Sequence, residues 1–184
     1  MRKTILLLII LAVVIAAAGF VYSNLRKGKI NYGEFKNMIK VSSSAFGQGE
    51  MIPQKFTCDG QNINPEILID GAPENAKSLA LIMDDPDSPS GNFVHWLVWN
   101  IKPNTKIINE NSAPESAVSG KNSAGKDQYI GPCPGSGTHR YIFRIFALDE
   151  IINLPQGASR QELEGAMQNH ILDAGELMGR YQRK

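Results

Sequence analysis

Short apolar runs, rich in β-branched and aromatic residues, recur along the chain after residue 40. Clusters of Gly, Pro, Asn and Asp separate these runs, which is the pattern of β-strands joined by turns and loops. No run is followed by a good amphipathic helix, so the sequence does not support an alternating βαβ layout. It predicts a mainly β domain, an antiparallel β-sandwich. We expect strands over residues 41–46, 66–69, 78–83, 94–101 and 140–148.

One segment near the C-terminus has the pattern of a helix. Residues 159–162 read Ser-Arg-Gln-Glu, the spacing of a capping box. Leu163, Ala166 and Met167 follow at helical spacing, and we expect the helix to end near His170. Residues 171–181 are compatible with a final strand or with an irregular tail.

The N-terminal segment differs in composition from the rest of the chain. Residues 4–22 form an uncharged, almost wholly apolar run behind Arg2 and Lys3. This is the pattern of an export signal or of a single membrane-spanning helix. The small residues at 16–18 suit cleavage by a signal peptidase, whereas the length of the run also suffices to span a bilayer. Basic residues flank the run on both sides, so they do not decide its orientation.

The sequence thus predicts three parts and an exported protein. These are a signal anchor or signal peptide over residues 1–22, a linker over 23–40 and one domain over 41–184. We favour a retained anchor with the domain outside the cytoplasm; a cleaved signal would give a secreted or periplasmic domain. From Ile30 onward 14 basic residues accompany 18 acidic ones, a net charge of −4. No basic footprint for nucleic acid is present, and we expect no nucleic-acid partner.

An acidic stretch, Asp-Asp-Pro-Asp-Ser-Pro over residues 84–89, invites comparison with a calcium loop. The comparison fails, because Pro89, Ser90 and Trp96 occupy the fifth, sixth and twelfth positions counted from Asp85, where a ligand, Gly and Glu are required. The alternative is a strand end closed by Asx turns. No metal site is predicted here.

His95 lies inside the next apolar run. Strict alternation places it on one face of the strand with Phe93, Leu97 and Trp99. A lone histidine among apolar neighbours is compatible with a buried core residue as well as with a functional one.

A second constellation spans residues 131–143, where a Gly- and Pro-rich loop leads into a strand carrying His139, Arg140 and Tyr141. It matches neither the Walker loop nor the dinucleotide fingerprint. Backbone N–H groups in a tight loop suit an anion, although a rigid turn explains the composition equally well.

Together the two constellations bring one histidine each beside carboxylates. A neighbouring Asp favours the imidazolium form, which together with loop amides suits phosphate or sulfate, while the carboxylates suit an attached amine. Two enzymatic readings compete: Cys133 and His139 as nucleophile and base, or His95, His139 and Asp85 as metal ligands. Neither has a specific signal, so we expect a non-enzymatic protein with no catalytic residue, no metal and no cofactor.

Two cysteines, Cys58 and Cys133, are present. In an exported chain they permit one disulfide, against the alternative of two separate buried thiols. We expect the disulfide.

Four sequence blocks resemble those of the phosphatidylethanolamine-binding protein family. DDPDSP, FVHWLVWNI and GPCPGSGTHRYIF are similar to its two signature blocks. FTCDGQNINPEI, over residues 56–67, resembles the CDGxNxSP block of the bacterial, Raf-kinase-inhibitor-like YbhB/YbcL branch, with Asn64 in place of Ser. The resemblance runs from about residue 41 to 184. It implies a Greek-key antiparallel β-sandwich with a pocket for phosphate-like anions and phospholipid head groups.

The resemblance also implies roles for individual residues. Asp85 matches the pocket aspartate and Asp87 supports its loop; His95 and His139 match the pocket histidines. Gly131 and Pro132 lie in the loop that approaches the anion, and Tyr141 follows on the pocket-facing side of its strand. We infer that Arg140, of opposite parity, is structural and ties the strand to Asp87 or another carboxylate.

The expected function is therefore non-enzymatic binding of an anionic or zwitterionic head group outside the cytoplasm, with membrane attachment through the N-terminal segment. One alternative is a protease or signalling inhibitor that acts on a protein partner through its surface. The other is a hydrolase that uses the His/Asp pocket.

Overall fold

The computed structural model describes residues 39–183. The predicted signal or anchor over residues 1–22, and all but the end of the predicted linker, lie outside these residues. Within 39–183, no helix has the length and apolar character needed to cross a membrane. Ile39 is buried and Lys40 begins the first strand, so the last two residues of the predicted linker belong to the domain.

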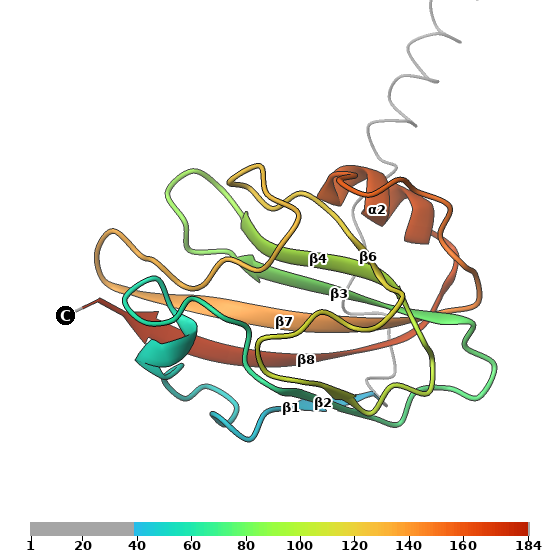
Figure 1. Ribbon diagram of the computed structural model, residues 1–184, viewed down its shortest axis with the longest axis horizontal. Helices are drawn as coiled ribbons and strands as arrows, with labels where there is room; N and C mark the ends of the chain where they lie inside the picture. Colours follow the sequence, from blue (N-terminus) through green and yellow to red (C-terminus); the bar gives the residue numbers. More distant parts are fainter. Residues whose placement is uncertain (1–38, 184) are drawn as a thin grey trace, which may run out of the picture.

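Two antiparallel sheets form the domain, in the orders β1-β2-β5 and β6-β4-β3-β7-β8 (Figure 1). Apolar residues of both sheets share one core, and α2 packs on the opposite face of the larger sheet. The elements are β1 (Lys40–Ser42), the 3-10 helix η2 (Gln54–Phe56), β2 (Ile67–Asp70), β3 (Ser78–Asp85), β4 (Phe93–Ile101), β5 (Ile107–Ile108), β6 (Val118–Ser119), β7 (Thr138–Leu148), α2 (Arg160–Met167) and β8 (Ile171–Gln182).

The prediction of a mainly β domain with one short helix near the C-terminus is confirmed. Four of the five expected strands are present to within two residues, whereas the first ends at Ser42 rather than at residue 46. The C-terminal segment, compatible in sequence with either a strand or a tail, is the long strand β8, paired along β7. The two-residue strands β5 and β6 were not predicted, because such short runs carry no recognisable period.

Strand β3 lies at the centre of the larger sheet and is buried at every position. Leu81 and Met83 face the core shared by the two sheets, while Ala80 and Ile82 face α2. Burial on both faces explains why this strand reads as a continuous apolar run rather than an alternating one.

Helix α2 begins at the predicted capping box. The Ser159 hydroxyl accepts a hydrogen bond from the Glu162 backbone N–H, and the Glu162 carboxylate accepts one from the Ser159 backbone N–H. Leu163 and Met167 bury the helix against the sheet. The helix ends at Met167, before the predicted end at His170, and Asn169 follows with a φ of 68°. A left-handed residue there turns the chain into β8.

A bulge in β4 changes the predicted orientation of His95. Val94 pairs with Asp84 and Trp96 pairs with Met83, so His95 is an extra residue opposite the β3 ladder. Trp96 joins the core between the sheets, whereas Val94, Leu97 and Trp99 pack toward α2. His95 lies edge-on to Tyr141 of the inter-sheet core, with ring centroids 5.2 Å apart. The prediction that His95 shares a face with Leu97 and Trp99 is therefore wrong, because strict alternation fails at a bulge.

Candidate functional site

A cavity of about 220 Å³ opens where the end of β3 meets the starts of β4 and β7. Both strand-borne histidines line it, and so do the loops that flank them. The lining residues are Asp85, Ser88, Pro89, Ser90, Phe93, His95, Ile130, Gly131, Cys133, Pro134, Gly135 and His139. Four of the residues expected at the site, Asp85, His95, Gly131 and His139, are thus at the cavity wall. Asp87, Pro132 and Tyr141 were also expected there but are not among the lining residues. We call this space the histidine cavity.

Asp85 and His139 form a buried pair across the neighbouring strands β3 and β7. His139 Nδ1 lies 2.7 Å from Asp85 Oδ2, and the two side chains are 11% and 5% exposed. The second carboxylate oxygen, Asp85 Oδ1, accepts a hydrogen bond of 2.8 Å from the backbone N–H of Asp87. Both oxygens of the carboxylate are therefore occupied, and the imidazole is held with Nδ1 on Asp85 and with Nε2 as its remaining polar atom.

His95 is anchored through the same ring atom but to a neutral acceptor. Its Nδ1 lies 2.7 Å from the carbonyl oxygen of Ile130, and because a carbonyl only accepts, Nδ1 carries the hydrogen. Burial lowers the pKa of His95 and outweighs the raising effects of the Ile130 carbonyl and of the Asp85 carboxylate. The neutral ring is therefore favoured, with Nε2 as an acceptor. The expectation of an imidazolium beside Asp85 is reversed at His95.

Aromatic rings fix His95 from two sides. The Phe93 ring centroid lies 4.8 Å from that of His95, and Tyr141 contacts it edge-on from β7. Tyr141 is fully buried, and this burial raises the pKa of its hydroxyl, which stays protonated. Tyr141 supports the imidazole from behind and is absent from the cavity wall.

The loop that contains Gly131 contributes fewer N–H donors than its composition indicated. The backbone N–H of Gly131 donates to Asn62 Oδ1 at 2.7 Å, and Pro132 and Pro134 have no N–H. A Cβ atom on Gly131 would lie 2.4 Å from the Phe56 carbonyl oxygen, so glycine here permits close approach of two loops. On the cavity wall, Cys133 and Gly135 of this loop each carry a backbone N–H, and that of Cys133 is directed at the Tyr141 hydroxyl.

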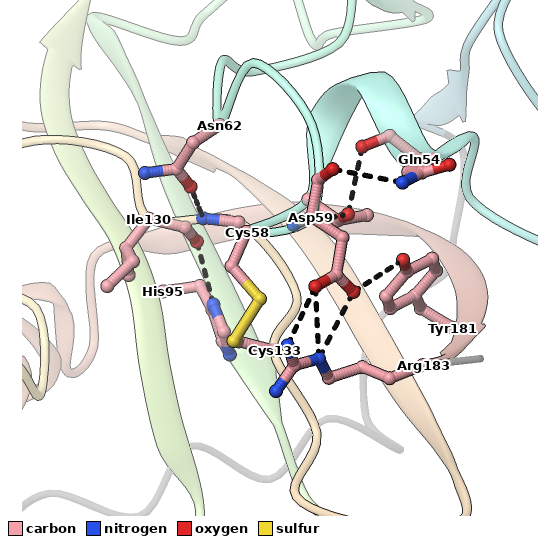
Figure 2. Close-up of a disulfide and its surroundings, with 11 residues drawn as sticks. Gln54, Cys58, Asp59, Asn62, His95, Ile130, Cys133, Tyr181 and Arg183 are labelled. Atoms are coloured by element: carbon pink, nitrogen blue, oxygen red, sulfur yellow. Dashed lines mark hydrogen bonds and ion pairs between the residues drawn. A yellow bond between two sulfur atoms is a disulfide. The ribbon is translucent and has the colours of Figure 1, made fainter.

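A disulfide joins the same two loops (Figure 2). Cys58 and Cys133 are bonded with a Cα–Cα distance of 5.4 Å, so the predicted pairing is present in the structure. The backbone N–H of Cys58 also donates to the Pro132 carbonyl at 3.1 Å, and the Tyr129 hydroxyl donates to the Phe56 carbonyl at 2.8 Å. Because Cys133 is bonded, it has no thiolate to act as a nucleophile while the bridge is intact.

Asp87 and Arg140 brace the acidic loop against β7. Asp87 Oδ2 accepts hydrogen bonds of 2.9 Å from both the backbone N–H and Nε of Arg140, and Oδ1 accepts one of 2.7 Å from Nη2. The Arg140 side chain lowers the pKa of Asp87 to about 2. Asp87 thus holds the loop in place, while Asp85 faces the cavity.

Sequence reasoning missed several residues of the wall. Ser88 and Ser90, whose hydroxyl oxygens are 3.0 Å apart, follow the aspartates and are indistinguishable in sequence from ordinary turn residues. Phe93 lies beside His95 at the cavity, as alternation within β4 places it, but it was not singled out as a site residue. Asn62 has a left-handed φ of 58° and was not singled out, although it holds Gly131.

Comparisons with known proteins agree with this architecture. A family model described as "Phosphatidylethanolamine-binding protein" matches residues 42–182. The UPF0098 protein PH1269 of Pyrococcus horikoshii is 48% identical over 165 residues, covering 85% of this chain and 83% of that protein. The UPF0098 protein of Methanothermobacter thermautotrophicus is 44% identical, over 79% of this chain and 99% of its own length.

Two solved structures share the fold. The phosphatidylethanolamine-binding protein homolog CT736 of Chlamydia trachomatis superposes with a TM-score of 0.77 at 38% identity, covering 81% of this chain and all of that one. YbcL of E. coli, described as a member of the mammalian PEBP family, superposes with a TM-score of 0.75 at 26% identity, covering 80% and 99%. With the family model matched along the whole domain, the chain belongs to the phosphatidylethanolamine-binding protein family, in the branch that includes YbcL.

Proposed function

We propose that the protein is a non-enzymatic binding protein whose histidine cavity takes a phosphate-like anion or the head group of a phospholipid. One observation carries the proposal: two histidines from different strands line one small cavity, and each has its Nδ1 anchored to an acceptor of the protein. Anchoring Nδ1 leaves Nε2 of each ring for a ligand, in a fixed position.

The charges in the cavity favour a phosphomonoester or a zwitterion. An imidazolium donates to phosphate oxygens, and a neutral ring accepts from the hydroxyl of a protonated phosphate. The Asp85 carboxylate is engaged by His139 and by the Asp87 backbone, and its remaining negative potential suits an amine on the same ligand. Phosphoethanolamine combines both features.

Export of the domain is part of the proposal. The disulfide at the cavity supports it, because cytosolic thiols are generally kept reduced whereas exported proteins retain such bonds. Alkylation of intact cells before lysis should find no free thiol on this chain. Two free thiols in freshly quenched cells would overturn export, whatever the ligand.

Ligand binding is tested on the full chain, kept soluble in a polyoxyethylene detergent that contains neither sugar nor phosphate. Imidazole NMR signals of His95 and His139 are followed during titration with inorganic phosphate, phosphoethanolamine and a short-chain phosphatidylethanolamine. We expect saturable shifts that His95→Ala and His139→Ala weaken. His170, which pairs with Asp149 at 2.9 Å and is not part of the cavity wall, supplies the matched control His170→Ala. No shift with any probe, or equal shifts in all variants, would overturn the proposal.

The same variants separate binding from hydrolysis. Turnover of p-nitrophenyl phosphate that disappears in His95→Ala and His139→Ala would replace the binding proposal by a hydrolase. Capture of a protein partner that survives both substitutions would point to the outer surface instead.

A further inference from the structure

A second cavity adjoins the histidine cavity along residues 128–131. Gln128 and Tyr129 line this second cavity, whereas Ile130 and Gly131 line the histidine cavity. Its volume is about 340 Å³, within the usual range of ligand pockets. Loops before β2, between β5 and β6 and after β6 surround it, and Trp96 of β4 contributes to its wall. We call it the amide cavity.

The amide cavity combines a fixed frame with uncommitted amide groups. Asn64 belongs to the frame: its Nδ2 donates to the Asn109 carbonyl at 2.9 Å, and its Oδ1 accepts from the Ser112 backbone N–H at 3.0 Å. The side chains of Asn111 and Gln128 make no hydrogen bond to any residue between 39 and 183, and Asn62 uses Oδ1 but not Nδ2. Each primary amide offers both a donor and an acceptor to a ligand.

Aromatic rings form the inner part of the wall. Trp96 and Tyr129 meet edge to face with centroids 5.7 Å apart. The Tyr129 hydroxyl donates to the Phe56 carbonyl at 2.8 Å, so the ring is held in place and its oxygen is not available as a donor. Because Trp96 is 2% exposed and Tyr129 is 8% exposed, the cavity has only a small patch of aromatic surface at its floor, below a rim of amides.

The charges around the amide cavity do not suit a phosphate-like anion, the ligand proposed for the histidine cavity. Among the described residues that line this cavity, Asp127 alone is charged. Its carboxylate accepts a hydrogen bond from the Gln156 amide. No lysine, arginine or histidine of the described chain lines the cavity, so a phosphate would have no counter-charge. A purely apolar ligand would leave the amides without partners, which is costly.

We propose that the amide cavity binds a neutral polyhydroxylated ring, a sugar or a cyclitol. Hydroxyl groups both donate and accept and so match the amides of Asn62, Asn111 and Gln128, while the small exposed part of Tyr129 and Trp96 at the floor suits a C–H group of the ring. The ring belongs either to a free saccharide or to the head group of a glycolipid. This site is independent of the anion proposed for the histidine cavity.

The test uses the full chain in the same sugar-free detergent. D-glucose, D-mannose and myo-inositol are titrated while the side-chain amide signals of Asn62, Asn111 and Gln128 and the indole signal of Trp96 are recorded by NMR. Vesicles of phosphatidylcholine with and without digalactosyldiacylglycerol form the second arm. We expect saturable shifts with at least one sugar, or vesicle binding that requires the glycolipid; the responding arm identifies the source.

Two substitutions decide whether the response comes from this cavity. Gln128→Ala should weaken binding by about threefold to tenfold, the usual effect of losing one hydrogen bond. Gln161→Ala, on the exposed face of α2, should leave sugar binding unchanged. No response in either arm, or a response that Gln128→Ala does not alter, would overturn the proposal while leaving the anion proposal intact.

Discussion

Asp84 and Asp85 are neighbours in β3, yet their side chains lie on opposite faces of the sheet. Asp85 faces the histidine cavity and pairs with one imidazole at 2.7 Å. Asp84 is wholly buried on the side of α2, where Arg144 and Arg160 contact its two oxygens at 2.7 and 2.6 Å. Arginine stays charged at any physiological pH, whereas histidine changes its charge there. One carboxylate thus anchors a permanent ion cluster, and the other orients a group able to respond to a ligand.

The surroundings of the two aspartates extend this contrast. On the α2 side Arg160 also binds Glu164 at 2.6 Å, and Arg144 approaches Glu176 at 3.3 Å, so each guanidinium group contacts a second carboxylate besides that of Asp84. On the cavity side a covalent bridge and a few hydrogen bonds hold the loops. We therefore expect the α2 side to govern stability and the cavity side to govern binding.

Replacing each aspartate by alanine should separate these roles most strongly. Asp84→Ala leaves Arg144 and Arg160 without their shared carboxylate and should reduce the free energy of unfolding by about 3 to 5 kcal/mol. Asp85→Ala removes the acceptor that holds His139 Nδ1 and should cost only about 1 to 2 kcal/mol, but should abolish the phosphate response. Urea denaturation and phosphate titration measure the two effects. Equal stability losses would contradict the division of roles.

The disulfide provides the next largest effect, confined to the cavity side. Converting Cys58 and Cys133 to serine should lower the free energy of unfolding by about 2 to 4 kcal/mol. The bonds from Gly131 to Asn62 and from Tyr129 to Phe56 still join the loops, so we expect weakened phosphate binding rather than its loss. Urea denaturation and phosphate titration of the double variant check this, with dithiothreitol-treated parent protein as the control. Unchanged stability would show that hydrogen bonds alone hold the loops.

Much of the fold was predictable from local pattern, because burial and turn chemistry act locally. The strands and the Ser159 capping box could be predicted from short stretches of sequence. The pairing of Cys58 with Cys133 followed from the presence of two cysteines in a chain expected to be exported. The family resemblance in the sequence assigned Asp85, His95 and His139 to one pocket, and all three line one cavity.

What sequence reasoning missed depends on partners far away in the chain. The bulge at His95 exists only in the register of β4 against β3, so alternation within β4 cannot reveal it. Gly131 was expected in the loop that approaches the anion, yet its N–H donates to Asn62, 69 residues earlier. The low pKa of His95 reflects burial, which a neighbouring Asp in the sequence does not predict.

A pH titration sharpens the comparison on the cavity side. Because burial lowers the pKa of His95 below its ordinary value of 6.5, folding disfavours protonation, and stability from this residue is full above pH 6.5 and declines as the pH falls through the lowered pKa. A bound anion raises that pKa again, so phosphate affinity should increase as the pH falls, by at most about tenfold per pH unit for one proton. Calorimetric titrations from pH 8 to 5 measure this, and His95→Gln should flatten the curve. A curve equally steep in His95→Gln would assign the proton to another group.

The Asp87–Arg140 pair should give the smallest effect, although its geometry is bidentate. Arg140 lowers the pKa of Asp87 from 3.8 to about 2, so stability from this pair is full above pH 3.8 and is lost as the pH falls toward 2. The Arg140 side chain is 53% exposed, and solvent screening reduces the contribution to less than about 1 kcal/mol. Arg140→Gln should therefore cost under about 1 kcal/mol at pH 7 and return the Asp87 pKa toward 3.8, as measured by urea denaturation and carboxyl NMR. A loss as large as that of Asp84→Ala would mean that the exposed brace, and not the buried cluster beneath α2, fixes the end of β3.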